Sequence, residues 1–392
     1  MANSLITPTA MTRKALMILH QKLNFVGSIN RQYDDSFAKS GAKIGDTLKI
    51  RNPNQYTVRS GATLSAQDTT ESSTSLQVAT QKGVDLNFSS TELTLSMDDF
   101  STRILEPAMS VLAANIEADA MGMYKDVYNS VWNGGASGSY NKVLDGRVIM
   151  QRSLAPAGER TANLSPLDMA DLVKDTKTLF NDQSAVSKQY KEGYMGRAAG
   201  FDFVENTMWA AHTRGDAAGY VCNTSTGITS GSAVVTLTTG TGTINQGDVF
   251  TIAGVFSVHP ETKASTGQLQ QFVASAAGTT SVSVYPVPVT SGAAQNVAVV
   301  SAGAGKAVTV AGTASTAVGT SMLYHKDAFT FATADLVMPS GVDFSAREVL
   351  DGISIRVVRQ YDINSDKFPC RLDVLYGYKT LRNQFACRLH NN

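Results

Sequence analysis

Apolar side chains recur at helical spacing near the start of the chain. Within residues 1–45, one stripe comprises Met11, Ala15, Ile18, Leu19 and Leu23, which is about three turns of helix. A helix of this length is marginal on its own in water, so we expect it to pack against another part of the protein. This segment is therefore interpreted as an N-terminal arm.

The longest helical pattern lies within residues 97–132. Pro107 follows Glu106, a placement that suits the first turn of a helix. The run Asn133-Gly134-Gly135 is expected to end the helix, because glycine favours the position after a helix C-terminus. The stripe has spacings of three and four and comprises Leu105, Met109, Leu112, Ile116, Ala120, Met123, Val127 and Val131.

A second helix is predicted to begin at the sequence SPLD, residues 165–168. Ser165 is a favourable capping residue, Pro166 suits the first helical position, and Asp168 suits the positive end of the helix dipole. The apolar face of this helix is expected to comprise Met169, Leu172, Val173, Thr176, Leu179 and Phe180.

Between the arm and the long helix, residues 46–95 alternate apolar and polar side chains in two runs. The outgoing run has Leu48, Ile50, Tyr56 and Val58, and the returning run has Leu76, Val78, Val84, Leu86 and Phe88. The polar stretch SGATLSAQDTTESST between them, residues 60–74, has Leu64 as its one large apolar residue and cannot form a core. The pattern predicts a long β-hairpin that lies on a neighbouring molecule.

A change of composition marks residues 217–320. This segment holds four charged residues, Asp248, Glu261, Lys263 and Lys306, although the whole chain has 33 basic and 33 acidic residues. Short β-runs separated by turn residues predict a small barrel or sandwich inserted into a host domain. The runs are AVVTLT, VFTIAGV, LQQFVAS, SVSVYPVPV, NVAVVSA and AVTVAG. After residue 320, GISIRVVRQYDI and CRLDVLYGYKTL predict strands that complete the host domain.

The totals limit the classes of function. A formal net charge of zero provides no global field to attract nucleic acid or an anionic membrane, and it suits self-association. Cys222, Cys370 and Cys387 have no CxxC spacing, so we expect buried, reduced thiols. Neither a signal peptide nor an apolar run long enough to span a membrane is visible, so we expect a soluble protein made inside the cell.

Candidate chemistry is sparse. The stretch SAGAGKA, residues 301–307, lacks both the first glycine and the final Ser or Thr of a phosphate-binding loop. Cys387 and His390 amount to half of a zinc site, and His325 can contact Asp327, an arrangement more typical of a structural hydrogen bond. The sequence therefore predicts no catalytic, cofactor or metal site, and no enzyme.

Two basic segments are candidates for facing nucleic acid, RVVRQY (356–361) and KTLRNQFACRLH (379–390). The more frequent alternative for such segments is a strand edge that faces solvent or another subunit.

Several stretches resemble major capsid proteins of tailed bacteriophages, of the P22 coat protein type. The segment 97–132 is similar to the spine helix of that family, and Tyr376-Gly377 matches its aromatic-glycine pair. The other similar stretches are NRQYDDSFAKSGAKIGDTLKIRNP (30–53), AGFDFVENTMWAAHT (199–213), GDVFTIAGVFSVHPETK (247–263) and CRLDVLYGYKTLRN (370–383).

This resemblance implies an α+β, HK97-like capsid fold with an N-arm, an extended hairpin called the E-loop, a long spine helix, P and A domains, and an inserted all-β barrel domain. The expected segments are the arm (1–45), the E-loop (46–95), the P domain with the spine helix (96–165), the first part of the A domain (166–216), the inserted barrel (217–320) and the return to A and P domain strands (321–392).

The resemblance also implies partners and a location. Copies are expected to form hexamers and pentamers of an icosahedral shell in the virion, assembled in the host cytoplasm. A scaffolding protein, a portal protein and double-stranded DNA, bound weakly and non-specifically, are further expected partners, and no membrane is. On the hairpin, the subunit-contact candidates are Arg51, Arg59, Leu64, Asp68 and Glu71.

Two other classes remain as alternatives. One is another self-assembling structural subunit, of a tail tube or a surface layer. The other is a surface glycan-binding protein in which the inserted barrel is the binding module.

Overall fold

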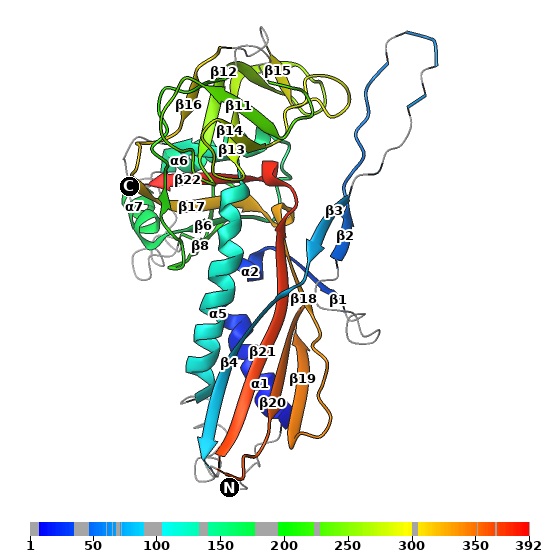
Figure 1. Ribbon diagram of the computed structural model, residues 1–392, viewed down its shortest axis with the longest axis vertical. Coiled ribbons are helices and arrows are strands. Elements are labelled where there is room, and N and C mark those ends of the chain that lie inside the picture. The colour runs from blue at the N-terminus through cyan, green and yellow to red at the C-terminus, as the bar shows by residue number, and fades with distance from the viewer. Residues whose placement is uncertain are drawn as a thin grey trace. The chain divides into compact units, whose positions relative to one another are not determined.

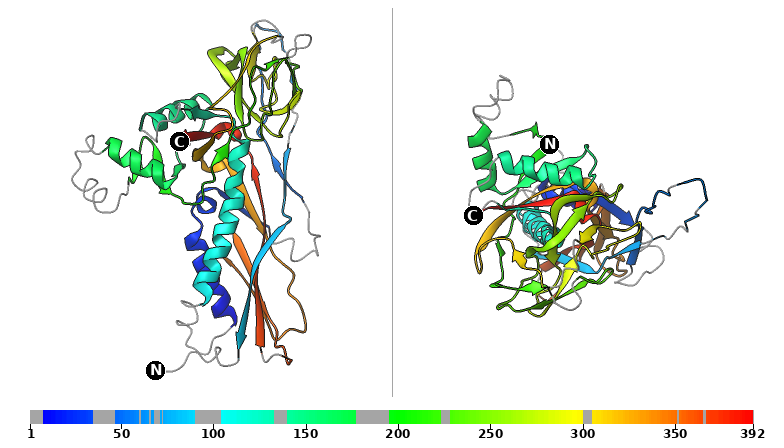
Figure 2. Two further views of the ribbon diagram at one scale, coloured as in Figure 1. Left: turned by 60° about the vertical axis from the view of Figure 1, so that its left-hand side comes forward. Right: turned by 90° about the horizontal axis from the view of Figure 1, so that it is seen from above.

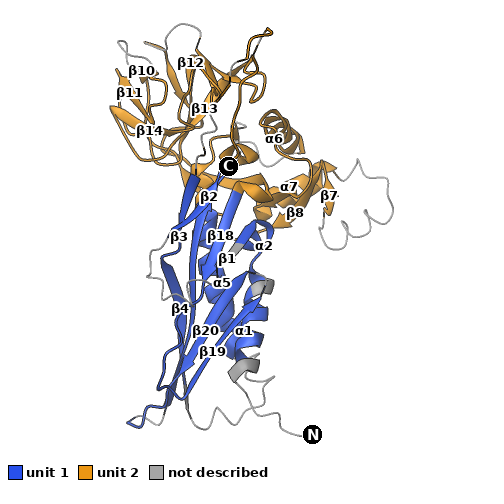
Figure 3. Cartoon of the chain, turned by 90° about the vertical axis from the view of Figure 1, so that its right-hand side faces the viewer, with its two compact units in different colours: residues 1–51, 73–121, 329–381 blue, residues 52–72, 122–328, 382–392 orange. Residues whose placement is uncertain are grey.

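The computed structural model describes most of the chain and divides it into two compact units (Figure 3). Unit 1 comprises residues 1–51, 73–121 and 329–381, and unit 2 comprises residues 52–72, 122–328 and 382–392. The described residues are 8–34, 47–59, 61–64, 66–67, 71, 73–89, 104–132, 140–176, 195–222, 228–299, 305–350, 352–364 and 367–391.

Unit 1 is built on a long antiparallel sheet with one parallel edge pair. The strand order is β1-β18-β21-β20-β19, and β4 pairs with β21 as the sixth strand, as Figure 1 shows. Strands β2 and β3 form a separate two-stranded sheet. The strands are β1 (Asn30–Asp34), β2 (Thr47–Arg51), β3 (Ser73–Gln77), β4 (Thr80–Ser89), β18 (Phe329–Ala334), β19 (Phe344–Leu350), β20 (Ile353–Arg359) and β21 (Lys367–Thr380).

The helix predicted in the arm is present as α1 (Pro8–Lys22), and all the residues of its predicted stripe are buried. It packs against β19 and against the longest helix, α5 (Glu106–Met121), which lies beside it in Figures 1 and 2. The short helix α2 (Phe25–Ser28) is also held on α5, because the buried Glu117 carboxylate accepts hydrogen bonds from the backbone N–H groups of Phe25 and Val26. The arm helix therefore packs against other elements of unit 1, as expected for a helix too short to be stable alone.

The long helix is shorter than predicted. The α-helix ends at Met121, continues as the 3-10 helix η3 (Gly122–Asp126), and is followed by strand β5 (Ser130–Trp132). Residues 130–132 instead pair in parallel with the C-terminal strand β22 (Ala386–Asn391), which gives Val131 a sheet partner, Leu389. The prediction of helix through Val131 was wrong, because this strand pairing outweighs the helical spacing. Residues 97–103 and 133–139 lie outside the described residues.

The predicted hairpin is also shorter than its pattern. Strands β2 and β3 pair antiparallel, with Leu48 opposite Leu76. The rest of the returning run forms β4, which pairs with β21 along its whole length, from Thr80 opposite Tyr376 to Ser89 opposite Lys367. The pairing of Val84, Leu86 and Phe88 within the hairpin was therefore a wrong prediction. That part of the returning run pairs instead with β21, which is a longer strand distant in the sequence.

Unit 2 contains a second mixed sheet, here called the host sheet. Its strand order is β5-β22-β17-β6-β8-β7, and β9 pairs with the start of β17. The remaining strands of this sheet are β6 (Arg160–Leu164), β7 (Arg197–Ala198), β8 (Phe201–Glu205), β9 (His212–Thr213) and β17 (Ala317–His325). Besides η3, the 3-10 helices described in this unit are η4 (Lys326–Ala328) and η5 (Asn383–Phe385).

Two helices accompany the host sheet. Helix α7 (Pro166–Thr176) begins where SPLD predicted, and the Ser165 hydroxyl accepts a hydrogen bond from the backbone N–H of Asp168 at 3.3 Å. Of its predicted face, Leu179 and Phe180 lie outside the described residues. Helix α6 (Tyr140–Arg152) was not predicted. Its Gly146 lies close to Leu323 of β17, because a Cβ at this position would come within 2.5 Å of the Leu323 Cδ1. A larger residue here would therefore force the Leu323 side chain to move.

The low-charge segment forms a second sheet in unit 2. Each of the six predicted β-runs contains a strand, and the two-residue strand β10 (Val221–Cys222) was not predicted. The strand order is β10-β11-β14-β13-β12-β15, with β16 pairing to β12. The strands are β11 (Val234–Thr238), β12 (Val249–Val258), β13 (Ser265–Ala274), β14 (Ser281–Tyr285), β15 (Val297–Val299) and β16 (Val308–Val310).

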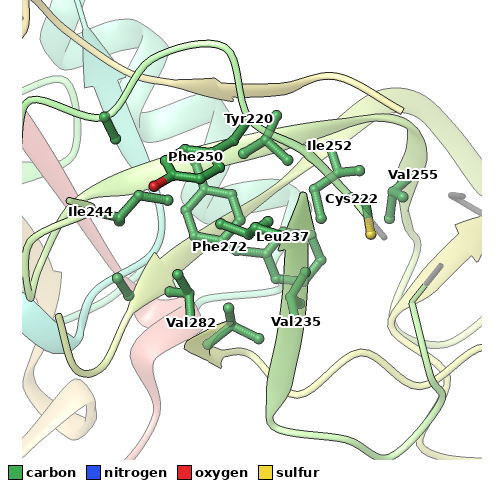
Figure 4. Close-up of a cluster of buried hydrophobic side chains, with 14 of the residues drawn as sticks. Tyr220, Cys222, Val235, Leu237, Ile244, Phe250, Ile252, Val255, Phe272 and Val282 are labelled. Carbon is green, nitrogen blue, oxygen red and sulfur yellow. The ribbon is translucent and has the colours of Figure 1, made fainter. Parts of the chain in front are cut away.

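Hydrogen bonds between β10 and the residues around β16 close this sheet into what we call the β-ring. Cys222 N donates to Lys306 O at 2.8 Å, and Val308 N donates to Tyr220 O at 2.9 Å. Buried side chains from all sides fill the interior, and Figure 4 shows Leu237, Phe250 and Phe272 pointing toward one another. The β-ring shares unit 2 with the host sheet, so the predicted segment boundaries, including those of a separate inserted domain, stay predictions.

Candidate assembly interface

The base of the hairpin is a packed structure. Leu76 on β3 and Val78 after it are fully buried, at 0% exposure, and Leu48 and Ile50 on β2 pack against the same cluster. The cluster is completed by Ala332, Ala334, Leu336 and Leu375. The alternation of apolar residues on β2 and β3 therefore fixes the hairpin register, because a slip of one residue would move these side chains out of the cluster.

The hairpin tip, residues 52–72, presents apolar side chains to solvent. Val58 is 96% exposed, Leu64 is 83% exposed and Tyr56 is 58% exposed. Isolated apolar residues on a surface are ordinary, but three on one short loop make this loop a candidate contact segment. Burying a valine or leucine side chain completely is worth about 1.5–3 kcal/mol. A contact that covers the tip would therefore gain free energy from burying these side chains.

Hydrogen bonds within the tip hold part of its backbone. The Gln67 side chain accepts from Thr57 N at 2.9 Å and donates to Thr57 O at 2.6 Å, so one amide satisfies both polar groups of a peptide residue across the loop. The Arg59 guanidinium donates to the carbonyl oxygens of Gly61 and Thr63, the latter at 3.0 Å. The tip therefore presents its exposed side chains from a backbone that is partly ordered in advance.

The sequence candidates occupy different parts of this hairpin. Arg51 ends β2, opposite Ser73, and is exposed. Leu64 and Glu71 are exposed in the tip, and Asp68 lies outside the described residues. Arg59 is exposed, but its guanidinium bonds the carbonyls of its own loop. The intersubunit ion pairs expected of these residues stay predictions.

Sequence reasoning missed Tyr56 and Val58 as contact candidates. Their alternation with polar neighbours predicts that they continue the strand, whereas β2 ends at Arg51. Pro53, two residues after the end of that strand, was the available signal, because proline cannot donate to a strand ladder.

A second group of polar side chains lies where the β-ring meets the host sheet in unit 2, and we call it the joint. Asp248 at the start of β12 binds His212 of β9, with 2.9 Å between Asp248 Oδ1 and His212 Nε2. Its other oxygen accepts from Gly215 N at 3.0 Å and from Asn245 N at 2.8 Å. Asp248 and His212 are both buried, so the joint fixes the start of the β-ring to the strand through which the chain enters it.

A side chain of the β-ring extends this joint to the edge of the host sheet. Gln271 of β13 accepts from Ser130 N at 2.8 Å and donates to Ser130 O at 2.9 Å. Ser130 begins β5, the edge strand of the host sheet, so the Gln271 amide takes the place of a neighbouring strand.

The histidine and cysteine residues that the sequence raised as candidates for chemistry are buried in the fold. The His325 ring accepts a hydrogen bond from Asp327 N at 3.2 Å, and burial lowers the pKa of His325. Burial raises the pKa of the Cys387 thiol to about 12, and all three cysteines are buried and free. Among the described residues, no group of His, Cys, Asp or Glu side chains could hold a metal ion.

The two basic segments use arginines inside the fold. In β20, Arg356 binds Asp373 at 2.7 Å, and Arg359 lies over the rings of Phe344 and Phe368. In the second segment, Arg388 is fully buried. Arg356 and Arg359 are half-buried and Lys379 of the second segment is exposed, so whether these segments face nucleic acid, solvent or another subunit stays a prediction. No helix of the described chain is long and apolar enough to cross a membrane.

Comparison with known proteins supports a capsid origin. The family model "P22 coat protein - gene protein 5" matches residues 29–387. The fold is similar to "Mycobacterium phage Che8" with a TM-score of 0.49 and 11% identity, covering 94% of this chain and 90% of that one. It is also similar to "Asymmetric unit of bacteriophage PhiM1 mature capsid" with a TM-score of 0.46 and 12% identity, covering 94% and 87%. No curated protein matched the sequence.

Proposed function

The chain belongs to the P22 coat protein family, and from this premise we propose that its copies join through the hairpin tip when they form the shell of a phage head. The chain is a major capsid protein, and its place is in the virion. Hexamers and pentamers of an icosahedral shell are the proposed arrangement of the copies.

The observation that supports the role of the tip is the contrast within one hairpin. The base buries Leu76 and Val78 completely, whereas the tip leaves Val58 and Leu64 almost fully exposed. The Gln67 bonds order the tip backbone before any contact forms, which lowers the entropy cost of docking. Each tip contributes little, but a closed shell repeats the contact once per subunit, so its stability comes from multiplicity.

Further partners follow from the family rather than from any described residue. We propose a scaffolding protein during assembly in the host cytoplasm, a portal protein at one vertex, and weak, non-specific contacts with enclosed double-stranded DNA. The neutral total charge suits weak contacts with DNA, because the chain has no excess of basic residues. We also propose that the β-ring acts as an inserted module of the subunit.

The experiment replaces the apolar tip by polar residues. The double variant Val58→Ser, Leu64→Ser is expected to keep the secondary structure and melting temperature of the parent chain but to form few closed particles. Electron microscopy and sedimentation of the variant, expressed with its scaffolding protein, measure the assembled fraction.

The matched control is Ile363→Ser, which removes an aliphatic side chain that is 80% exposed in a different turn. It is expected to assemble like the parent chain. Normal particles from the double variant, or equal loss from the Ile363 variant, would show that the tip is not the specific contact.

A further inference from the structure

The C-terminal strand brings two buried basic side chains into the joint. Arg388 and His390 are two residues apart on β22, so they lie on the same face of the host sheet. Arg388 Nη1 donates to Gly247 O at 2.8 Å, and its guanidinium lies 5.9 Å from the centre of the Tyr124 ring. The His390 ring lies 5.4 Å from Trp132 and 6.3 Å from His212.

These side chains are not fully satisfied within the closed joint. Arg388 is 0% exposed, and its Nε and Nη2 atoms have no hydrogen-bond partner among the described residues. His390 Nδ1 is likewise buried and without a partner in that part of the chain. Buried polar atoms without partners are costly, so the joint is a place where opening to water recovers free energy.

The charges around His390 make a proton on it unfavourable. Burial lowers its pKa well below the usual 6.5, and the basic groups Arg388, His212 and Lys142 lower it further. Lys142 of α6 lies against it, donating from Nζ to His390 O at 3.3 Å. From the other elements, Tyr124 and Asp126 of η3 and Asp248 of the β-ring act on Arg388, and Lys125 packs beside Gly247.

The Asp248 carboxylate of the joint already has several partners. Asp248 binds His212 and two backbone N–H groups, and it also offsets Arg388. A proton on His390 would therefore add positive charge beside Arg388 and Lys142, and no carboxylate of the described residues acts on His390 to balance it.

We propose that the joint is a pH-sensitive latch, which holds the β-ring to the host sheet at neutral pH and opens in mild acid. When the joint opens, His390 enters water and regains an ordinary pKa near 6.5. Below that pH the open state binds a proton that the closed state does not bind. Opening therefore becomes up to about tenfold more favourable for each pH unit below 6.5. Above 6.5 both states leave His390 neutral, so the latch is insensitive to pH there.

Hydrogen exchange of the full-length chain between pH 7.5 and pH 5 tests the latch, with rates corrected for the intrinsic pH dependence of exchange. Protection is expected to be constant above pH 6.5 and to fall by up to about tenfold per unit below it in residues 212–222, 245–252 and 386–391. Strands β6 and β8, which lie in the host sheet away from the joint, are expected to keep their protection. Constant protection at the joint down to pH 5 would overturn the proposal.

The variant His390→Phe keeps an aromatic ring between Trp132 and His212 but cannot take a proton. It is expected to abolish the acid slope at the joint. The matched control is His325→Phe, because His325 is another buried histidine of unit 2 with a lowered pKa, and it is expected to leave the slope at the joint unchanged.

An acid slope that persists in His390→Phe would assign the effect to another group and overturn the proposal. If that variant does not fold, His390→Gln replaces it with the same expected outcome. An independent measurement is the NMR titration of His390 in the parent chain. Titration near pH 6.5 with the joint still protected would also overturn the latch.

Discussion

Two glutamines of this protein perform the same task in opposite surroundings. Gln67 in the hairpin tip and Gln271 in the β-ring each use one side-chain amide to bond both the N–H and the C=O of a single backbone residue. Thr57, the partner of Gln67, is exposed. Ser130, the partner of Gln271, is buried beside the joint.

The difference shows why similar hydrogen bonds serve different purposes. Water replaces the bonds of an exposed backbone group when they break, so the Gln67 bonds contribute little to folding. Buried backbone groups lose free energy when left unpaired, so the Gln271 bonds are needed for the folded state. The tip is thus ordered for contact with other molecules, whereas the joint is ordered for the stability of the subunit.

The largest expected effect comes from Asp248→Ala in the joint. This change removes the partner of His212 and leaves unpaired the buried N–H of Gly215 and the partly buried N–H of Asn245. The free energy of unfolding, measured by urea denaturation, should fall by about 3 kcal/mol or more.

The matched control for that experiment is Asp202→Ala. Asp202 forms an exposed ion pair with Arg197 at 3.8 Å, so its loss should cost less than about 1 kcal/mol. Equal losses from the two variants would contradict the assignment of the joint as a buried determinant of stability.

The next effect separates the hairpin base from its tip. Leu76→Ala opens a cavity in the buried cluster and should lower the free energy of unfolding by about 2–5 kcal/mol. Leu64→Ala removes the same atoms from an exposed position and should change it by less than about 0.5 kcal/mol. Thermal or urea unfolding of both variants checks this, and a large loss from Leu64→Ala would mean that the tip is packed within the isolated subunit.

The smallest effect tests the two glutamines directly. Gln271→Ala should destabilise the chain by about 1–3 kcal/mol, because Ser130 N and O are left unpaired in buried surroundings. Gln67→Ala should leave unfolding within about 0.5 kcal/mol of the parent chain, but it should reduce the assembled fraction seen by electron microscopy. The comparison fails if Gln67→Ala destabilises folding as much as Gln271→Ala.

Local pattern predicted the strands of the β-ring well. Each of the six runs contains a strand because β-branched residues and turn residues alternate there over short distances. The hydrogen bonds that close the ring, from Cys222 to Lys306 and from Val308 to Tyr220, could not be predicted, because they join residues far apart in sequence. The parallel pairing of β5 with β22 could not be predicted for the same reason. The helical spacing of apolar residues continues beyond Met121, so the sequence predicted a helix that is longer than α5.

The candidate site was predicted in part. The low apolar content of residues 60–74 predicted a segment that cannot form a core, and Leu64 within it is exposed. The exposure of Tyr56 and Val58 depends on where β2 ends, which is a boundary that alternation alone leaves open. Arg59 had no local signal for its bonds to Gly61 and Thr63, since side-chain contacts within a loop depend on the loop conformation.

The sequence by itself determined the local elements of this protein: the docked arm helix, the start of α7, the strands of the β-ring and the family to which the chain belongs. These follow from periodicity, capping residues and turn chemistry, which act over a few residues. Tertiary structure alone decided that β4 pairs with β21 and that Arg388 and His390 lie in a buried joint. Such choices depend on the free energy of burying groups that are distant in sequence, which no local pattern records.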